Sequence, residues 1–190
     1  QAMKSKSFLD DPIIVSTGNS QKAIKDAKNS LTGSLSIGGQ EHYYLEGQVA
    51  MSIPTESNEM LVHSSTQNPT EVQHLVAHVL SVPQNAIEVV TRRMGGGFGG
   101  KETDSSQLAC VCAIFSKKTK RPVKARLSRR DDILLTGKRH DFVANYEVGY
   151  SDEGLIQGIN IVLAARCGYS LDLSKAIVSR ALFHADNTYF

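Results

Sequence analysis

The nine-residue stretch MGGGFGGKE, residues 94–102 and called the glycine loop below, decides how this chain folds; five of its residues are glycine. A segment rich in β-branched residues, 86–91, precedes it and predicts a strand, while residues 107–118 predict a helix after it. A strand that breaks into glycines before a helix brings backbone N–H groups close to a ligand, and the helix N-terminus adds partial positive charge. The pattern is therefore typical of a loop that binds an anion or a cofactor.

Two nucleotide-binding motifs match this loop only in part. Gly95, Gly97 and Gly100 fit the G-x-G-x-x-G fingerprint, but the region about 20 positions further on is basic where the motif requires an acidic residue. Gly95, Gly100 and Lys101 fit most of the P-loop, whose final hydroxyl residue is replaced by Glu102. A carboxylate at this last position would repel a triphosphate. Because each motif lacks one required residue, neither identifies the ligand. An ordinary strand-to-helix turn that binds nothing is a third interpretation of the same residues.

The composition indicates a globular protein of one or two domains. The chain has 190 residues, of which 41% are apolar and 21% charged, and its net charge of +2 argues against bulk electrostatic binding of nucleic acid. No apolar run approaches the roughly 18 residues of a membrane span, so no membrane partner is expected. Three cysteines are an odd count, which fits a reducing, cytoplasmic compartment better than a disulfide framework.

A second strand-to-helix junction lies earlier in the chain. Asn68 is a good helix N-cap and Pro69 suits the first helical position. Glu71 stands three residues after the cap, so the pattern predicts a helix over 69–81. Gln67 therefore stands at the end of a strand, with an amide that can both donate and accept hydrogen bonds. The alternative interpretation is a solvated turn glutamine.

His74 and His78 are four residues apart on the same predicted helix, a spacing that metal ligands can use. The metalloprotease form of this motif requires glutamate directly after the first histidine, and Leu75 occupies that position. Because no acidic or cysteine cluster accompanies them, both histidines are predicted to be solvated.

Hydrophobic periodicity predicts the remaining elements. The predicted helices are 21–29, 69–81 and 105–118, and the predicted strands are 30–37, 43–53, 60–64, 86–91, 123–128 and a long hairpin over 142–165. Residues 129–132 and 137–140 are predicted to be charged loops. Apolar residues at helical spacing are expected to be buried, namely Val72, Leu75, Val76, Val79, Leu80, Leu108, Val111, Cys112 and Phe115.

This succession predicts an α+β fold, in which a mixed or antiparallel sheet carries helices packed on one face. Residues 1–28 are interpreted as an N-terminal connecting segment, and residues 29–190 as a partial domain of a longer chain. The two strand-to-helix junctions, one with Gln67 and one with the glycine loop, are hypothesised to lie side by side on one rim.

The sequence RMGGGFGGKE at 93–102, preceded by STQN at 65–68, closely resembles the molybdopterin-binding domain of the molybdenum hydroxylases. This family comprises the xanthine dehydrogenases and aldehyde oxidases. Supporting blocks are GQEHYYLE at 39–46, LTGKRH at 135–140 and RALFH at 180–184. The resemblance runs from residue 29 to the end, and Asp141 departs from it because many relatives carry proline there.

The resemblance implies an enzyme that inserts an oxygen from water beside a ring nitrogen, converting hypoxanthine and xanthine towards urate. Gln67 matches the glutamine whose amide approaches a ligand of the molybdenum. Gly97, Phe98 and Gly99 match the loop whose backbone meets the ligand sphere of the metal. Glu102 matches the glutamate that holds the purine, where aldehyde oxidases carry an apolar residue. The alternative for Glu102 is an acid favoured near a helix N-terminus.

The same resemblance implies that much of the enzyme lies elsewhere. The general base and the arginine opposite the purine are expected beyond residue 190, so no catalytic residue and no protein ligand to molybdenum are expected in this chain. FAD and 2Fe–2S clusters are expected in other parts of the parent enzyme, whose remaining domains or subunits are the expected partners. The parent is expected to form a homo-oligomer, and the isolated chain to be inactive. The alternatives are an aldehyde oxidase-type molybdenum hydroxylase and a standalone α+β module that binds phosphate or a nucleotide.

Overall fold

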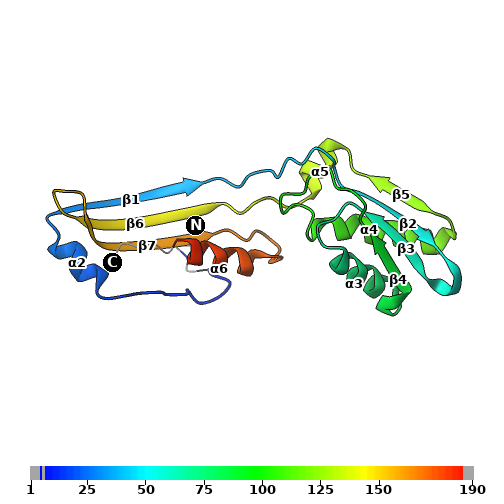
Figure 1. Cartoon of the computed structure of the whole chain (residues 1–190), viewed down its shortest axis with the longest axis horizontal. Helices are drawn as coiled ribbons and strands as arrows, with labels where there is room; N and C mark the ends of the chain where they lie inside the picture. The colour runs from blue at the N-terminus through cyan, green and yellow to red at the C-terminus, as the bar shows by residue number, and fades with distance from the viewer. Residues whose placement is uncertain (1–4, 6, 186–190) are drawn as a thin grey trace. The chain divides into compact units, whose positions relative to one another are not determined.

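The computed structural model describes Ser5 and residues 7–185, which form two compact units. One unit consists of residues 40–139, and the other combines the described residues before 40 with those after 139. Both are drawn in Figure 1, and each is described by itself below. The predicted division between residues 1–28 and 29–190 stays a prediction.

The 40–139 unit contains a mixed four-stranded sheet with strand order β4-β3-β2-β5. β2 pairs antiparallel with both β3 and β5, whereas β3 pairs parallel with β4. The strands are β2 (Val49–Pro54), β3 (Met60–Ser64), β4 (Ile87–Val90) and β5 (Val123–Arg126). The helices are α3 (Pro69–Leu80), α4 (Asp104–Thr119) and α5 (Arg129–Leu135), with short 3-10 turns η1 (Glu56–Asn58) and η2 (Gln84–Ala86).

The start of α3 follows the predicted capping pattern. The side chain of Asn68 accepts a hydrogen bond from the backbone N–H of Glu71 at 3.2 Å, and Pro69 occupies the first helical position. Ser81 ends the helix in the left-handed conformation, with φ of 53°. This capping fixes the point at which the chain leaves β3, and therefore the position of Gln67 at the junction.

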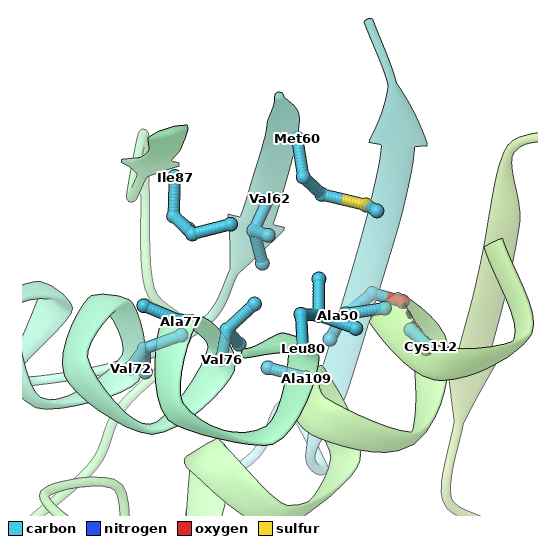
Figure 2. Close-up of a cluster of buried hydrophobic side chains, with 11 residues drawn as sticks. Ala50, Met60, Val62, Val72, Val76, Ala77, Leu80, Ile87, Ala109 and Cys112 are labelled. Carbon is cyan, nitrogen blue, oxygen red and sulfur yellow. Dashed lines mark hydrogen bonds between the residues drawn. The ribbon is translucent and has the colours of Figure 1, made fainter. Parts of the chain in front are cut away.

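The hydrophobic core lies between the sheet and helices α3 and α4, which pack on one face of it (Figure 2). Its buried side chains come from both layers and are Ala50, Met60, Val62, Val72, Val76, Ala77, Leu80, Ile87, Ala109, Cys112 and Ala113. The prediction of an α+β fold with helices on one face of a mixed sheet is therefore confirmed. This core supports both strand-to-helix junctions, since β3 leads into one and α4 follows the other.

The second unit is an antiparallel three-stranded sheet of order β1-β6-β7. Its strands are β1 (Asn29–Ile37), β6 (Phe142–Tyr150) and β7 (Ile156–Ala165), and its helices are α2 (Ser20–Asp26) and α6 (Ser174–His184). α2 approaches the sheet closely at Gly149 and Gly158, where an added Cβ would lie 2.7 Å from the Cα of Ile24 and 2.9 Å from the Cβ of Ala23. The predicted hairpin of β6 and β7 is confirmed. No helix in the described part of the chain is long and apolar enough to cross a membrane.

Two predicted secondary structures are wrong. Residues 43–48 form a loop before β2 rather than the first half of a strand, because buried Tyr44 and Gln48 bond to other parts of the unit instead of to a neighbouring strand. The predicted charged loop at 129–132 belongs to helix α5, Arg129–Leu135. Its N-cap, Ser128, accepts from the N–H of Asp131 at 3.1 Å, a signal that the charged run concealed. Helix α6 has no counterpart among the predicted elements.

The predicted buried face of α4 is also wrong in part. Val111 and Phe115 are exposed, while Ser105, Ala109 and Cys112 are buried against the sheet or its neighbours. Small side chains let α4 approach β2 closely, so the larger apolar residues lie on the outer side of the helix. On α3, Leu75 and Val79 are likewise more exposed than their spacing predicts.

Replacing Val76 by alanine tests whether the α3 contact with the sheet carries the stability of this unit. Val76 is fully buried, so losing two methyl groups is expected to lower the free energy of unfolding by about 2 kcal/mol. Val79→Ala is the matched control, because Val79 lies on the same helix but is 43% exposed, and a change of about 0.5 kcal/mol or less is expected. Chemical denaturation measures both. Equal losses would contradict the assignment of the core.

Candidate functional site

The two strand-to-helix junctions meet, as hypothesised from the sequence. Gln67 follows β3, and its side-chain oxygen Oε1 accepts hydrogen bonds from the backbone N–H groups of Gly99 at 2.9 Å and Lys101 at 3.2 Å. The backbone N–H of Gln67 in turn donates to the carbonyl of Lys101 at 2.8 Å. The junction before α3 and the glycine loop before α4 are thus joined directly, which places Gln67 against the loop.

These hydrogen bonds determine which way the Gln67 amide faces. An amide group has one oxygen that accepts and one nitrogen that donates, and only the oxygen can pair with two N–H donors. The reversed orientation would place the Nε2 hydrogens against the N–H groups of Gly99 and Lys101. Nε2 therefore faces away from the loop, and the Gln67 side chain is exposed. The result is a hydrogen-bond donor presented at the surface of the junction.

The tip of the glycine loop is a tight turn with an exposed aromatic side chain. The carbonyl of Gly97 accepts from the N–H of Gly100 at 2.8 Å, and the two residues between them, Phe98 and Gly99, have positive φ values of 53° and 90°. Positive φ is uncommon outside glycine and costs about 1–3 kcal/mol, a strain that is found preferentially at functional sites. The Phe98 side chain is 72% exposed, so burial of its ring in the described structure does not explain the conformation.

Gly97 is required for the close approach of the Gln67 side chain. A Cβ added to Gly97 would lie 2.5 Å from Gln67 Oε1 and 2.8 Å from its amide carbon. Any larger residue would therefore push the amide off the loop. The predicted cofactor-binding residues Gln67, Gly97, Phe98 and Gly99 are brought together in one structure, although their roles toward a cofactor stay predictions.

Beneath the loop, Lys101 turns its side chain into the protein. Its side chain is completely buried, and Nζ donates to Oε2 of Glu46 at 3.0 Å and to Oγ of Ser65 at 2.9 Å. Burial acts to raise the pKa of Glu46, but hydrogen bonds from Ser65, Gly95 and Lys101 outweigh it and lower the pKa below its usual value. An inward-facing amine cannot reach a phosphate bound on the loop. The P-loop interpretation therefore does not fit the structure.

A second buried network supports the loop from the side of α5. Asp132 is buried and accepts from the hydroxyl of Tyr44 at 2.5 Å and from the backbone N–H of Gln48 at 2.7 Å. The side-chain amide of Gln48 donates to the carbonyl of Gly100 at 2.9 Å, which ties the network to the loop. Burial and the bond to Asp132 raise the pKa of Tyr44. Arg129 adds a hydrogen bond to the carbonyl of Tyr44 at 2.7 Å.

None of these supporting residues was predicted from the sequence to belong to the site. Tyr44 and Glu46 lie within residues 39–46, one of the blocks that resemble the molybdenum hydroxylases, and this resemblance could have indicated them. Asp132 and Arg129 belong to the helix that was predicted to be a loop. Their contribution depends on contacts between segments far apart in the chain, which periodicity does not show.

Glu102 is the last residue of the glycine loop, just before α4, and is half-buried. The preceding residue, Lys101, is hydrogen-bonded to Gln67 through both its N–H and its carbonyl, so one short piece of backbone holds Gln67 and Glu102 next to each other. The acid in the first turn of α4 is Asp104, whose carboxylate accepts from the N–H of Gly137 at 3.1 Å. Because Glu102 lies one residue before the N-cap Thr103, an acid favoured near a helix N-terminus stays the alternative explanation of Glu102.

The donor set at this site suits an anionic organic cofactor. Among Ser5 and residues 7–185 no group of three His, Cys, Asp or Glu side chains could hold a metal ion, and His74 and His78 are exposed on α3. What the rim offers instead is the amide of Gln67 and a glycine-rich backbone that a ligand can approach closely. Such a site could bind a metal-containing cofactor through hydrogen bonds to the organic part of the cofactor, without a protein ligand to the metal.

Comparison with known sequences agrees with this geometry. The family model described as the molybdopterin cofactor-binding domain matches residues 7–190. The xanthine dehydrogenase of Dictyostelium discoideum is 42% identical over 188 residues, which are 99% of this chain and 14% of that protein. The xanthine dehydrogenase/oxidase of Felis catus is 43% identical over 189 residues, again 99% of this chain and 14% of the relative. The chain thus spans a small part of the length of these relatives.

Solved structures share the fold at lower identity. The aldehyde oxidoreductase from Desulfovibrio gigas matches 78% of this chain and 16% of its own chain with a TM-score of 0.69 and 21% identity. The CO dehydrogenase from Oligotropha carboxidovorans matches 76% of this chain and 18% of its own chain with a TM-score of 0.67 and 18% identity. These two likenesses concern the fold alone. The match of the family model to nearly the whole chain shows that this chain belongs to the family of molybdopterin cofactor-binding domains.

Proposed function

We propose that this chain is part of the catalytic portion of a xanthine dehydrogenase, which hydroxylates hypoxanthine and xanthine towards urate with water as the oxygen source. The observation that carries the proposal is the backbone of Lys101, which is hydrogen-bonded to Gln67 through its N–H and its carbonyl and is followed directly by Glu102. An outward-facing donor suits the cofactor, and a neighbouring carboxylate suits a substrate with ring N–H groups. The names of the Dictyostelium and cat relatives support the same substrate class.

Each residue of the site has a distinct proposed part. Gln67 donates a hydrogen bond from Nε2 to the cofactor, while the backbone of Gly97, Phe98 and Gly99 lies against the cofactor. When bound, the molybdenum-molybdopterin cofactor supplies the redox chemistry. Glu102 accepts hydrogen bonds from N–H groups on the purine ring and so holds the purine in the site.

The rest of the reaction is proposed to depend on other parts of the parent enzyme. These parts supply the general base, the 2Fe–2S clusters and FAD, and they are the principal partners of this chain. The parent is proposed to be a cytoplasmic homo-oligomer. An aldehyde oxidase is the closest alternative, and it differs in the expected residue at the position of Glu102.

The isolated chain is expected not to oxidise xanthine. The base and most of the cofactor contacts lie outside it on this proposal, so the purified 190-residue chain should neither retain molybdopterin firmly nor turn over substrate. Urate formation is followed by absorbance, with the full-length parent as the positive control. Urate production by the isolated chain at a rate close to that of the parent would contradict this part of the proposal.

Replacing Glu102 by alanine in the full-length parent tests the purine assignment. Losing a charged hydrogen-bond partner of the substrate is expected to lower kcat/KM for xanthine by about 10²-fold or more, with little loss for benzaldehyde. Molybdenum content is measured in each preparation, and Glu88→Ala, which removes an exposed acid on β4, is the matched control. Full xanthine activity in the Glu102 variant would contradict the assignment of a purine substrate to this residue. An equal loss of activity for both substrates would indicate that the substitution damages the loop.

Replacing Gln67 by glutamate separates its two hydrogen-bonding functions. A carboxylate can still accept from the N–H groups of Gly99 and Lys101, but it has no N–H to donate. If donation is the function, kcat should fall by about 10²-fold or more while molybdenum is retained, and Gln67→Ala should be similarly impaired. A glutamate variant as active as the wild type would instead assign Gln67 to holding the loop.

A further inference from the structure

The carboxylate of Glu46 is the point at which three segments of the site are tied together. Its Oε2 accepts from the backbone N–H of Gly95 at 3.0 Å, from Nζ of Lys101 at 3.0 Å and from the hydroxyl of Ser65. The backbone N–H of Glu46 also donates to the carbonyl of Gly95 at 3.1 Å. The beginning of the glycine loop, its end and the residue two before Gln67 therefore share one oxygen atom.

Lys101 joins this anchor to the exposed part of the site. Its side chain has no exposed surface and lies over the ring of Tyr44, 4.7 Å from the centroid. Its backbone N–H and carbonyl are the groups that bond Gln67, and Glu102 is the next residue in the chain. The buried end of one residue thus sets the position of two side chains proposed to face the cofactor and the substrate.

Burying a lysine side chain is an unfavourable way to stabilise a protein. Removing an ammonium group from water is costly, and apolar residues of similar volume often stabilise a protein as well as a buried ion pair does. What an ion pair with several hydrogen bonds adds is a defined arrangement, since each donor has one acceptor at one distance. An unbranched apolar side chain in the same space would leave the two ends of the loop free to shift relative to Ser65.

We infer that the ion pair between the buried Lys101 and the partly exposed Glu46, together with Ser65, is a positioning device that holds Gln67 and Glu102 in register for the reaction. This inference rests on the proposed function for its effect on turnover. Lys101 is completely buried and so cannot touch substrate, while Oε2 of Glu46 is occupied by its hydrogen bonds to the glycine loop and to Ser65. Both act through the N–H groups of Gly99 and Lys101 and the amide of Gln67.

The test uses Lys101→Met in the full-length parent, a change that keeps most of the side-chain length and removes the charge. The matched control is Lys117→Met, because Lys117 also ties two elements with its amine, donating to the carbonyl of Leu80 at 2.8 Å, but lies at the far end of α4. Glu46→Gln is the second variant, since glutamine retains one acceptor oxygen for Gly95. Six quantities are measured: kcat and KM for xanthine, molybdenum content, pterin content, melting temperature, and amide hydrogen exchange of residues 95–102.

A positioning role predicts a specific combination of results. Lys101→Met should lower kcat by about 10–10²-fold with cofactor retained, and the amides of residues 95–102 should exchange at least about 10-fold faster. Glu46→Gln should show the same pattern to a smaller degree, and Lys117→Met should leave kcat and loop exchange unchanged whatever its melting temperature.

Other combinations overturn the inference. Unchanged kcat and unchanged loop exchange in Lys101→Met would show that the pair only fills space. If Lys101→Met fails to fold, unaltered kcat and exchange in Glu46→Gln would reject the inference in the same way. Failure of the proposed function is distinguishable: a wild-type parent that converts no purine rejects that function, while the exchange measurement still decides whether the ion pair holds the loop.

Discussion

The structure of the site depends on one hydrogen-bonded contact, in which a single side-chain oxygen of Gln67 accepts from the backbone of Gly99 and Lys101. This contact requires a residue without a side chain at Gly97, which explains a glycine where the backbone must approach an amide closely. It also converts glutamine, a residue that can donate or accept, into one that presents only donors. The chemistry of the site therefore follows from the geometry of the loop.

Two layers of support hold this contact in place. The apolar core between the sheet and helices α3 and α4 fixes the ends of the two junctions, as Figure 2 shows for the side chains of β3 and α3. Closer to the loop, the polar contacts of Lys101 with Glu46 and of Gln48 with Gly100 bond to the loop itself. Hydrophobic burial is non-directional, whereas hydrogen bonds and ion pairs specify orientation, so the two layers have different functions.

Local signals in the sequence predicted what depends on local structure. The cap at Asn68, the hairpin of β6 and β7 and the strand before the glycine loop follow from short patterns, and the resemblance identified the family. The α5 helix was missed because its charged residues concealed the cap at Ser128. The outward position of Phe115 was predicted wrongly, because the burial of small residues such as Ala109 depends on how closely α4 approaches the sheet. The ion pair of Lys101 was missed because its partner is 55 residues away in the chain.

The central claim is that one loop presents the Gln67 amide to the cofactor and the Glu102 carboxylate to a purine. The measurement that tests it most directly is a crystal structure of the full-length parent with its cofactor and a bound purine. We expect Nε2 of Gln67 to face the cofactor while Oε1 stays on the loop, and the Glu102 carboxylate to lie within hydrogen-bonding distance of the purine ring. A purine bound away from Glu102, or a Gln67 amide detached from Gly99, would contradict it.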